Sequence, residues 1–396
     1  RVGFHRYQFP EGKKAGIIFQ LEGLLGPTEV RDGKLEKVDE YTLQGQLTNA
    51  PTRRRPKDFT VYCTVKFDQP LEKLISQSSS HTMVSFSEGT DQVQMKVGLS
   101  YTSNENASLN IEIELPDWDF SQVVSDSKVE WNTLLSRIKV KSEDTIQVRR
   151  FYTDLWHALQ GRRIINDVNG AYPDNTGDTF RIGQLPLQTD GTPQFNHYNS
   201  DSFWGAQWTL TTLWGLVYPD IYAEFVKSLL QYYRDGGLIP RGPSGGNYTY
   251  VMTGASSTPF IVSAYQKGIR DYDVALMYEG LKKNHLENGI MTKAGYEHET
   301  MLGGGLLHYM KNDYVPYPIP EGDNFGYHQD GASLTMEYAY QDWTLAQLAL
   351  ALGQKEDYEY FLKRSENYKN QFDPESGWMR PKDVNGQWKT PFDPYQ

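Results

Sequence analysis

The sequence predicts a multidomain β + α chain in which an N-terminal β-sandwich precedes an incomplete (α/α)6 toroid. Up to about residue 125, short runs of alternating apolar and polar residues are separated by turn-forming clusters, which is the pattern of a sandwich. Beyond that point the apolar period becomes helical, and the expected helices come in pairs. We therefore expect a β-sandwich domain at 1–125, a linker helix region at 126–145 and a toroid domain at 146–396.

The expected strands of the sandwich are short segments with a two-residue period. Residues 59–67 alternate and are rich in β-branched and aromatic side chains, and residues 91–101 alternate as well. Residues 15–22 form a short apolar run. Residues 109–115 have the most regular period-two pattern in the chain, so we expect a further strand there.

The helical part begins with isolated helices and a long irregular stretch. Residues 131–138 are expected to form a linker helix, and residues 144–160 carry apolar side chains at helical spacing. Residues 162–196 are rich in Gly, Pro, Asp and Asn, and a loop of this length inside a compact domain is usually functional.

Helical hairpins are expected after this stretch. The expected pairs are 203–217 with 220–234, 258–267 with 272–284, and 333–352 with 355–372. Helix, short turn, helix and then a longer loop is the rhythm of an α-hairpin toroid. A toroid of six hairpins needs twelve helices, whereas this pattern supplies about seven. We therefore expect the toroid to be incomplete in this chain.

Composition excludes several classes of function. A net charge of −11 disfavours a nucleic-acid partner, and no apolar run is long enough to span a membrane. The single cysteine, Cys63, excludes an internal disulfide framework and a thiolate metal site. The glycine-rich runs lack the Lys-Ser/Thr ending of a phosphate-binding loop, and no Gly-x-Ser-x-Gly motif is present. The histidines show no metal-ligand spacing, and the sequence leaves the oligomeric state open.

The strongest candidate for a ligand site is the stretch around Asp201. If the chain is helical from about residue 203, Trp204, Gln207 and Trp208 share one face and Asp201 lies at the N-terminal end. Aromatic rings stack on the C–H faces of sugars, while a carboxylate and an amide bind hydroxyl groups. The alternative is a capped helix whose two tryptophans belong to the core.

Carboxylates are the remaining candidates for chemistry. Glycoside hydrolysis needs one protonated carboxyl group and one base or nucleophile. Glu337 lies near the start of a strongly apolar expected helix, so it is either a pocket residue and in-chain candidate acid or a charge that favours the helix N-terminus. Asp342 is expected to cap or pair structurally.

Several motifs together resemble glycoside hydrolase family 92, the calcium-dependent exo-α-mannosidases. The most specific is Ser333-Leu-Thr-Met-Glu-Tyr-Ala-Tyr-Gln-Asp-Trp343. Further matches lie in family order at residues 3–10, 151–157, 251–254 and 372–381. The resemblance spans nearly the whole chain, and the family has an N-terminal β-sandwich packed on an (α/α)6 toroid.

The resemblance implies removal of terminal α-linked mannose, with α-1,2 linkage favoured, from a mannose-containing glycan with inversion. A calcium ion of the family binds two hydroxyls of the terminal sugar and helps to distort it. Asp201 corresponds to the aspartate of the family's Asp-Thr-Phe-Arg motif, which contacts the terminal mannose. Trp204 stands where that motif usually has arginine, so the substrate of this chain is expected to differ.

The resemblance also places the family's general acid and base in segments that would follow Gln396, and a glycine-rich opening segment before Arg1. We therefore expect a chain truncated at both ends. Family members are often exported by bacteria, which predicts a periplasmic, cell-surface or secreted protein. Two alternatives stay open, namely a catalytically silent carbohydrate-binding protein and a lyase or hydrolase acting on another glycoside.

Overall fold

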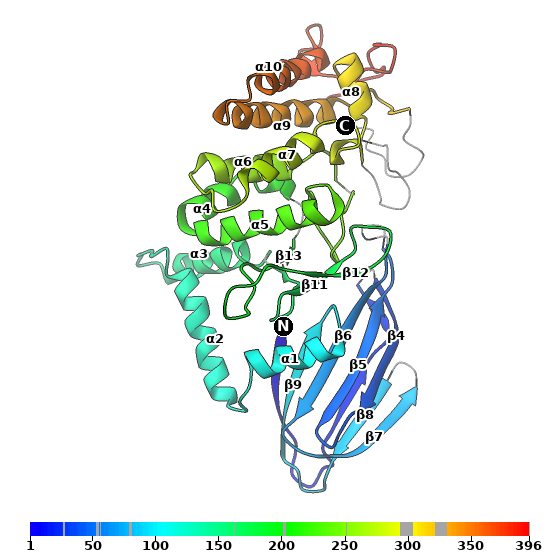
Figure 1. The fold of residues 1–396 in the computed structure, drawn as a ribbon, viewed down its shortest axis with the longest axis vertical. Coiled ribbons are helices and arrows are strands. Elements are labelled where there is room, and N and C mark those ends of the chain that lie inside the picture. Colours follow the sequence, from blue (N-terminus) through cyan, green and yellow to red (C-terminus); the bar gives the residue numbers. More distant parts are fainter. Residues whose placement is uncertain are drawn as a thin grey trace. The chain divides into compact units, whose positions relative to one another are not determined.

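The computed structural model divides into two compact units, residues 1–52 with 57–198 and residues 53–56 with 199–396. Figure 1 traces both units along the chain. Domain boundaries near residues 125 and 145 stay predictions. The residues that the structure describes are 1–26, 28–52, 55, 57–78, 81–161, 163–200, 203–250, 252–293, 304–320 and 331–395.

A larger and a smaller antiparallel sheet form the β-rich part of the first unit. The larger sheet has the spatial order β1 (Val2–Gln8), β9 (Gln92–Ser100), β6 (Phe59–Phe67), β5 (Thr42–Asn49), β4 (Thr28–Lys37) and β3 (Gly23–Leu25). The smaller sheet has the order β2 (Gly16–Gln20), β8 (His81–Phe86) and β7 (Leu71–Ser78). The strands predicted at 15–22, 59–67 and 91–101 are confirmed, and β6 has the predicted ends.

Apolar side chains from both sheets pack into one core. Val65 and Phe67 of the larger sheet belong to the same buried cluster as Val84 and Phe86 of the smaller one. The rings of Phe67 and Phe86 meet edge to face, with their centroids 5.4 Å apart. Because side chains along a strand alternate between faces, each sheet can turn an apolar face inward and a polar face to water. The predicted β-sandwich is therefore confirmed.

The strand predicted at 109–115 is wrong, because these residues form most of the helix α1 (Asn104–Glu114). Ser103 caps this helix by accepting a hydrogen bond from the backbone N–H of Asn106 at 3.1 Å. Ala107 and Ile111 lie one turn apart and are buried, whereas Ile113 is 64% exposed. The alternation in the sequence is therefore coincidental, and the burial follows the helical period.

Two further helices and several short strands follow the sheets along the chain. The linker helix predicted at 131–138 is longer and begins earlier, because Asp119 caps α2 (Phe120–Leu135). The helix predicted at 144–160 is confirmed as α3 (Thr145–Ala158), with Asp144 as its cap. The irregular stretch after it contains the short strands β10 (Arg163–Ile164), β11 (Ala171–Asp174), β12 (Arg181–Gln184) and β13 (Tyr198–Asn199).

The second unit is built mainly from helices that lie against one another (Figure 1). α4 packs on α5 and α6, and α9 packs on α6, α7 and α10. Its elements are η1 (Phe203–Gly205), α4 (Leu210–Val217), α5 (Pro219–Gly236), α6 (Ser257–Gln266), α7 (Val274–Asn284), η2 (Ile290–Thr292), α8 (Leu306–Asn312), α9 (Gly331–Ala351), α10 (Lys355–Arg364), η3 (Ser365–Gln371), β14 (Phe372–Asp373) and β15 (Trp378–Met379). The order of a sandwich followed by helical hairpins is confirmed, and the completeness of a toroid stays a prediction.

Most of the predicted helices are present, but some ends differ. α5 ends as expected, because Gly237 adopts a left-handed conformation with a φ of 76°. The helix predicted at 355–372 is wrong beyond Arg364, where the chain tightens into the 3-10 helix η3. α8 was not expected, since seven residues are too few to establish a helical period. None of the described helices combines the length and apolar character that a membrane span requires.

Gly98 on β9 allows α1 to approach the sheet. A Cβ atom at this position would lie 2.2 Å from the carbonyl oxygen of Ala107 and 2.7 Å from Cγ1 of Ile111. We expect Gly98→Ala to lower the free energy of unfolding by about 1–3 kcal/mol, because the helix must shift away from the strand. Urea denaturation measures this change. Gly161→Ala is the control, since no described atom lies within 4 Å of its Cβ position. Equal stability of the two variants would contradict the proposed close approach.

Candidate functional site

The stretch that follows residue 202 does not form the helix predicted from residue 203. Phe203–Gly205 is a short 3-10 helix, turns follow, and α4 begins only at Leu210. The prediction at 203–217 is therefore wrong for its first part. Gly205 weakens a helix there, and Thr209 precedes α4 without a side-chain capping bond. Asp201 lies outside the described residues.

Trp204 and Trp208 nevertheless meet. Their ring centroids are 5.4 Å apart with an interplanar angle of 63°, which is an edge-to-face contact. The side chains are 40% and 68% exposed, so the alternative that both belong to the core is wrong. The turn, and not a helical face, brings the two indoles together. A pair of partly exposed indoles offers apolar ring surface to a ligand.

Gln207 lies between these two tryptophans in the chain. Its Oε1 atom is buried and accepts no hydrogen bond from the described residues. A buried carbonyl without a donor costs about 1–3 kcal/mol. The Oε1 atom of Gln207 is therefore not part of the surface that the two exposed rings present.

Phe203 anchors this segment to the buried side of the unit. Its ring centroid lies 4.5 Å from that of Phe260 on α6, and its backbone N–H donates to the carbonyl of Arg241 at 3.1 Å. The buried guanidinium of Arg241 donates in turn to the carbonyls of Ile290 and Lys293, the latter at 2.7 Å. The exposed tryptophans therefore follow a residue whose ring and backbone are both fixed.

Glu337, the other predicted site residue, lies on α9. Gln341 donates from Nε2 to Oε1 of Glu337 at 2.5 Å, and the other amide atom of Gln341 accepts from the backbone N–H of Ala255 at 2.6 Å. Burial raises the pKa of Glu337, and the Gln341 hydrogen bond opposes part of that shift. A carboxyl group whose pKa is raised holds a proton more readily, as both a general acid and a hydroxyl-binding donor require.

Gly254 completes the contact of Gln341. This glycine has a φ of +70°, and a Cβ atom on it would lie 2.6 Å from Oε1 of Gln341. Gly254, the last residue of the motif at 251–254, therefore meets the motif on α9 at this amide. The structure places Glu337 on α9 with Gln341, and places Trp204 with Trp208 in the turn before α4.

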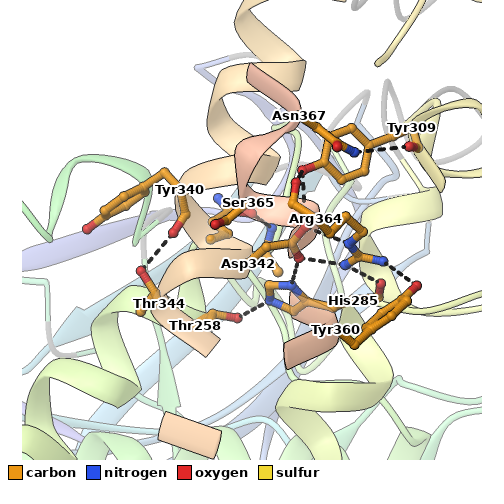
Figure 2. Close-up of polar contacts among 12 residues, drawn as sticks. Thr258, His285, Tyr309, Tyr340, Asp342, Thr344, Tyr360, Arg364, Ser365 and Asn367 are labelled. Atoms are coloured by element: carbon orange, nitrogen blue, oxygen red, sulfur yellow. Dashed lines mark hydrogen bonds and ion pairs between the residues drawn. The ribbon is translucent and has the colours of Figure 1, made fainter. Parts of the chain in front are cut away.

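Asp342 has the structural role expected from the sequence (Figure 2). Its Oδ1 atom lies 2.8 Å from Nδ1 of His285 and 2.5 Å from Nη2 of Arg364, and its Oδ2 atom lies 2.6 Å from Nε of Arg364. The hydroxyl of Tyr309 also donates to this carboxylate, at 3.1 Å. The hydroxyl of Thr258 lies 2.8 Å from Nε2 of His285.

Threonine, histidine and aspartate thus stand in the order of a nucleophile, a base and an orienting acid. Thr258, His285 and Asp342 are all 0% exposed, so no substrate reaches them. Because a carboxylate only accepts, Nδ1 of His285 carries the proton and Nε2 accepts from Thr258. No local sequence pattern indicates this pairing, since His285 and Asp342 are 57 residues apart. The network is structural.

The pKa values agree with a neutral histidine beside an ionised aspartate. Burial lowers the pKa of His285, against the opposing influence of Asp342. Burial works to raise the pKa of Asp342, but the charge of Arg364 outweighs it, and the pKa lies below its ordinary value. The described part of the chain gathers no group of three or more His, Cys, Asp or Glu side chains that could hold a metal ion.

Family sequence models match both parts of the chain. Residues 106–396 match the glycosyl hydrolase family 92 catalytic domain, and residues 1–111 match the family 92 N-terminal domain. A curated relative, an uncharacterized secreted glycosidase from Arthroderma benhamiae, is 26% identical over 318 residues, which cover 76% of this chain and 35% of the relative.

Solved structures share the fold. A family GH92 α-mannosidase from Bacteroides thetaiotaomicron has a TM-score of 0.83 and 24% identity, covering 100% of this chain and 52% of that one. An inverting GH92 mannosidase from the same organism has a TM-score of 0.80 and 21% identity, covering 99% and 51%. The first enzyme is also similar in its complex with mannoimidazole, with a TM-score of 0.82. The chain spans about half the length of these solved relatives.

The ion pair of Asp342 yields a prediction for stability. We expect Asp342→Asn to lower the free energy of unfolding by about 3–5 kcal/mol, because the guanidinium of Arg364 stays buried without its anion. Urea denaturation measures the loss. The control is Glu359→Gln, which removes an exposed pair with Lys355 at 3.9 Å and should change stability by less than about 0.5 kcal/mol. A loss of similar size in both variants would show that the buried pair has no special role.

The buried histidine yields a prediction for pH dependence. Because the folded-state pKa of His285 lies below the ordinary value of 6.5, the unfolded chain binds more protons and stability falls as the pH drops below about 6.5. His197, whose pKa burial lowers to about 3, acts in the same sense. We expect His285→Gln to reduce the slope of stability against pH between about pH 6 and 5, by up to about 1.4 kcal/mol per pH unit. An unchanged slope in urea titrations at several pH values would contradict a neutral His285.

Proposed function

Since the chain belongs to glycosyl hydrolase family 92, we propose that it removes terminal α-linked mannose from glycans by an inverting hydrolysis. The observation that carries the substrate class is the edge-to-face pair of the partly exposed Trp204 and Trp208. Exposed rings stack on the C–H face of a sugar. Gln207 stays a predicted hydroxyl-binding residue, although its Oε1 atom is buried in the structure. The mannosidases of the same fold support mannose as the sugar.

Glu337 is proposed as a substrate-binding carboxyl group. Its raised pKa lets it donate to a sugar oxygen over a wider pH range than an exposed glutamate, and Gln341 fixes its orientation. The general acid and base are proposed to lie in segments outside residues 1–396, as the resemblance to the family implies. Asp201 is proposed to contact the terminal sugar on the same ground.

The finer features of the reaction rest on the family. We propose α-1,2 linkage specificity, calcium assistance and export from the cell, and the name of the secreted relative from Arthroderma benhamiae supports export. A bound calcium ion would act as a template for sugar hydroxyls. The described residues gather no side-chain cluster for such an ion.

Mannose release from α-1,2-mannobiose tests the proposal. The protein as its source organism makes it is assayed with added calcium and then with a chelator. We expect release with calcium and a loss of activity with the chelator that added calcium restores. If mannose release is unchanged in the chelator, calcium assistance is contradicted, but removal of mannose is not. No release with calcium, together with retained mannobiose binding, would favour a silent carbohydrate-binding protein.

Variants test the roles of the two site segments. We expect Trp208→Ala to raise KM about 2- to 10-fold, because one ring contact with the sugar is lost. Trp378→Ala is the control, since this indole is 45% exposed on β15.

We expect Glu337→Gln to weaken substrate binding with kcat largely retained. A fall of kcat by about a thousandfold or more in Glu337→Gln would make Glu337 the general acid instead.

A further inference from the structure

A groove between α6 and α9 is separate from the Trp204–Trp208 turn. It has a volume of about 370 Å³, at the lower end of the range of roughly 300–1,000 Å³ for ligand pockets. Along α9 its lining residues are Tyr340, Trp343, Thr344 and Gln347, which are spaced so that they share one helix face. α6 lines the opposite side and packs directly on α9.

Aromatic rings dominate the α9 side of this groove. Tyr340 is 41% exposed and Trp343 is 48% exposed, although they belong to a helix that is otherwise largely buried. Figure 2 shows the ring of Tyr340 pointing away from the buried network around Asp342. The buried Asp342 and the exposed rings of Tyr340 and Trp343 therefore lie on different faces of α9.

The polar side chains of the groove include two amides that have no hydrogen-bond partner within the part of the chain that the structure describes. Gln266 on α6 and Gln347 on α9 line it, and neither amide hydrogen-bonds to any described residue. Each amide offers two donors and an acceptor. Ser263, also in the lining, accepts from the ammonium group of Lys267 at 2.5 Å. The described residues that line the groove carry no formal charge.

We propose that this groove binds a neutral oligosaccharide, as a second saccharide site. The rings of Tyr340 and Trp343 stack on the C–H faces of the sugar, and the amides of Gln266 and Gln347 bind its hydroxyls. The lining residues themselves are uncharged, and the ammonium group of Lys267 lies against Ser263 at one side of the groove. An apolar protein surface would bury both amides without partners, at about 1–3 kcal/mol for each unpaired group. The site includes no residue of the proposed reaction and does not depend on that reaction.

Binding of mannotetraose and maltotetraose, measured by isothermal titration calorimetry, tests the proposal on the protein as its source organism makes it. We expect Trp343→Ala to weaken binding at one site roughly 3- to 10-fold, and Gln347→Ala to weaken it as well. Trp378→Ala should bind like the wild type. In Trp208→Ala the groove should still bind, which separates it from the site of the proposed function. Because the ligand is neutral, affinity should be the same in low and high salt.

Three results would overturn the proposal. Trp343→Ala and Gln347→Ala could bind both sugars as the wild type does, while urea denaturation shows that they are folded. Trp208→Ala could abolish all binding, which would leave a single saccharide site. Sedimentation could show a dimer that Trp343→Ala dissociates, which would make the groove an interface between copies of the chain. If the protein hydrolyses mannobiose but the groove variants bind sugars as the wild type does, only the groove site is refuted. If the groove binds sugar but no hydrolysis occurs, only the proposed reaction is refuted.

Discussion

The helical unit depends on one buried carboxylate. Asp342 lies on α9 with no exposed surface, and it contacts Arg364 at the end of α10, His285 at the end of α7 and Tyr309 on α8. Removing a carboxylate from water costs several kcal/mol, which only a complete set of partners offsets. These partners come from helices that are distant in sequence. The network therefore joins residues at α7, α8, α9 and α10 in one packed arrangement.

This constraint has a consequence for function. Because Asp342 fixes one face of α9, the other face presents Glu337, Tyr340 and Trp343 in fixed positions. Glu337 is held through Gln341, which reaches the backbone of Ala255 before α6. The same helix thus carries a buried anchor, a carboxyl group with a raised pKa and an exposed aromatic surface. A rigid scaffold of this kind reduces the ordering cost of ligand binding.

Local patterns predicted much of the fold, whereas pairings across the chain did not follow from them. The alternation in β6 and the stripe of α5 that ends before Gly237 specify their elements directly. The alternation at 109–115 was misleading, because the Ser103 cap and the close approach allowed by Gly98 favour a helix. The contact of Trp204 with Trp208 was predicted on a helix but arises in a turn. The sequence predicts that Asp342 pairs structurally. It does not identify the partners, since they come from other helices.

The anomeric form of the released sugar tests the central claim most directly. Proton NMR spectra recorded in the first minutes of α-1,2-mannobiose hydrolysis distinguish the two anomers before they interconvert. An inverting mannosidase releases β-mannose first, because water attacks from the face opposite the leaving group. Initial release of α-mannose would indicate a retaining mechanism with a covalent intermediate and would contradict the account.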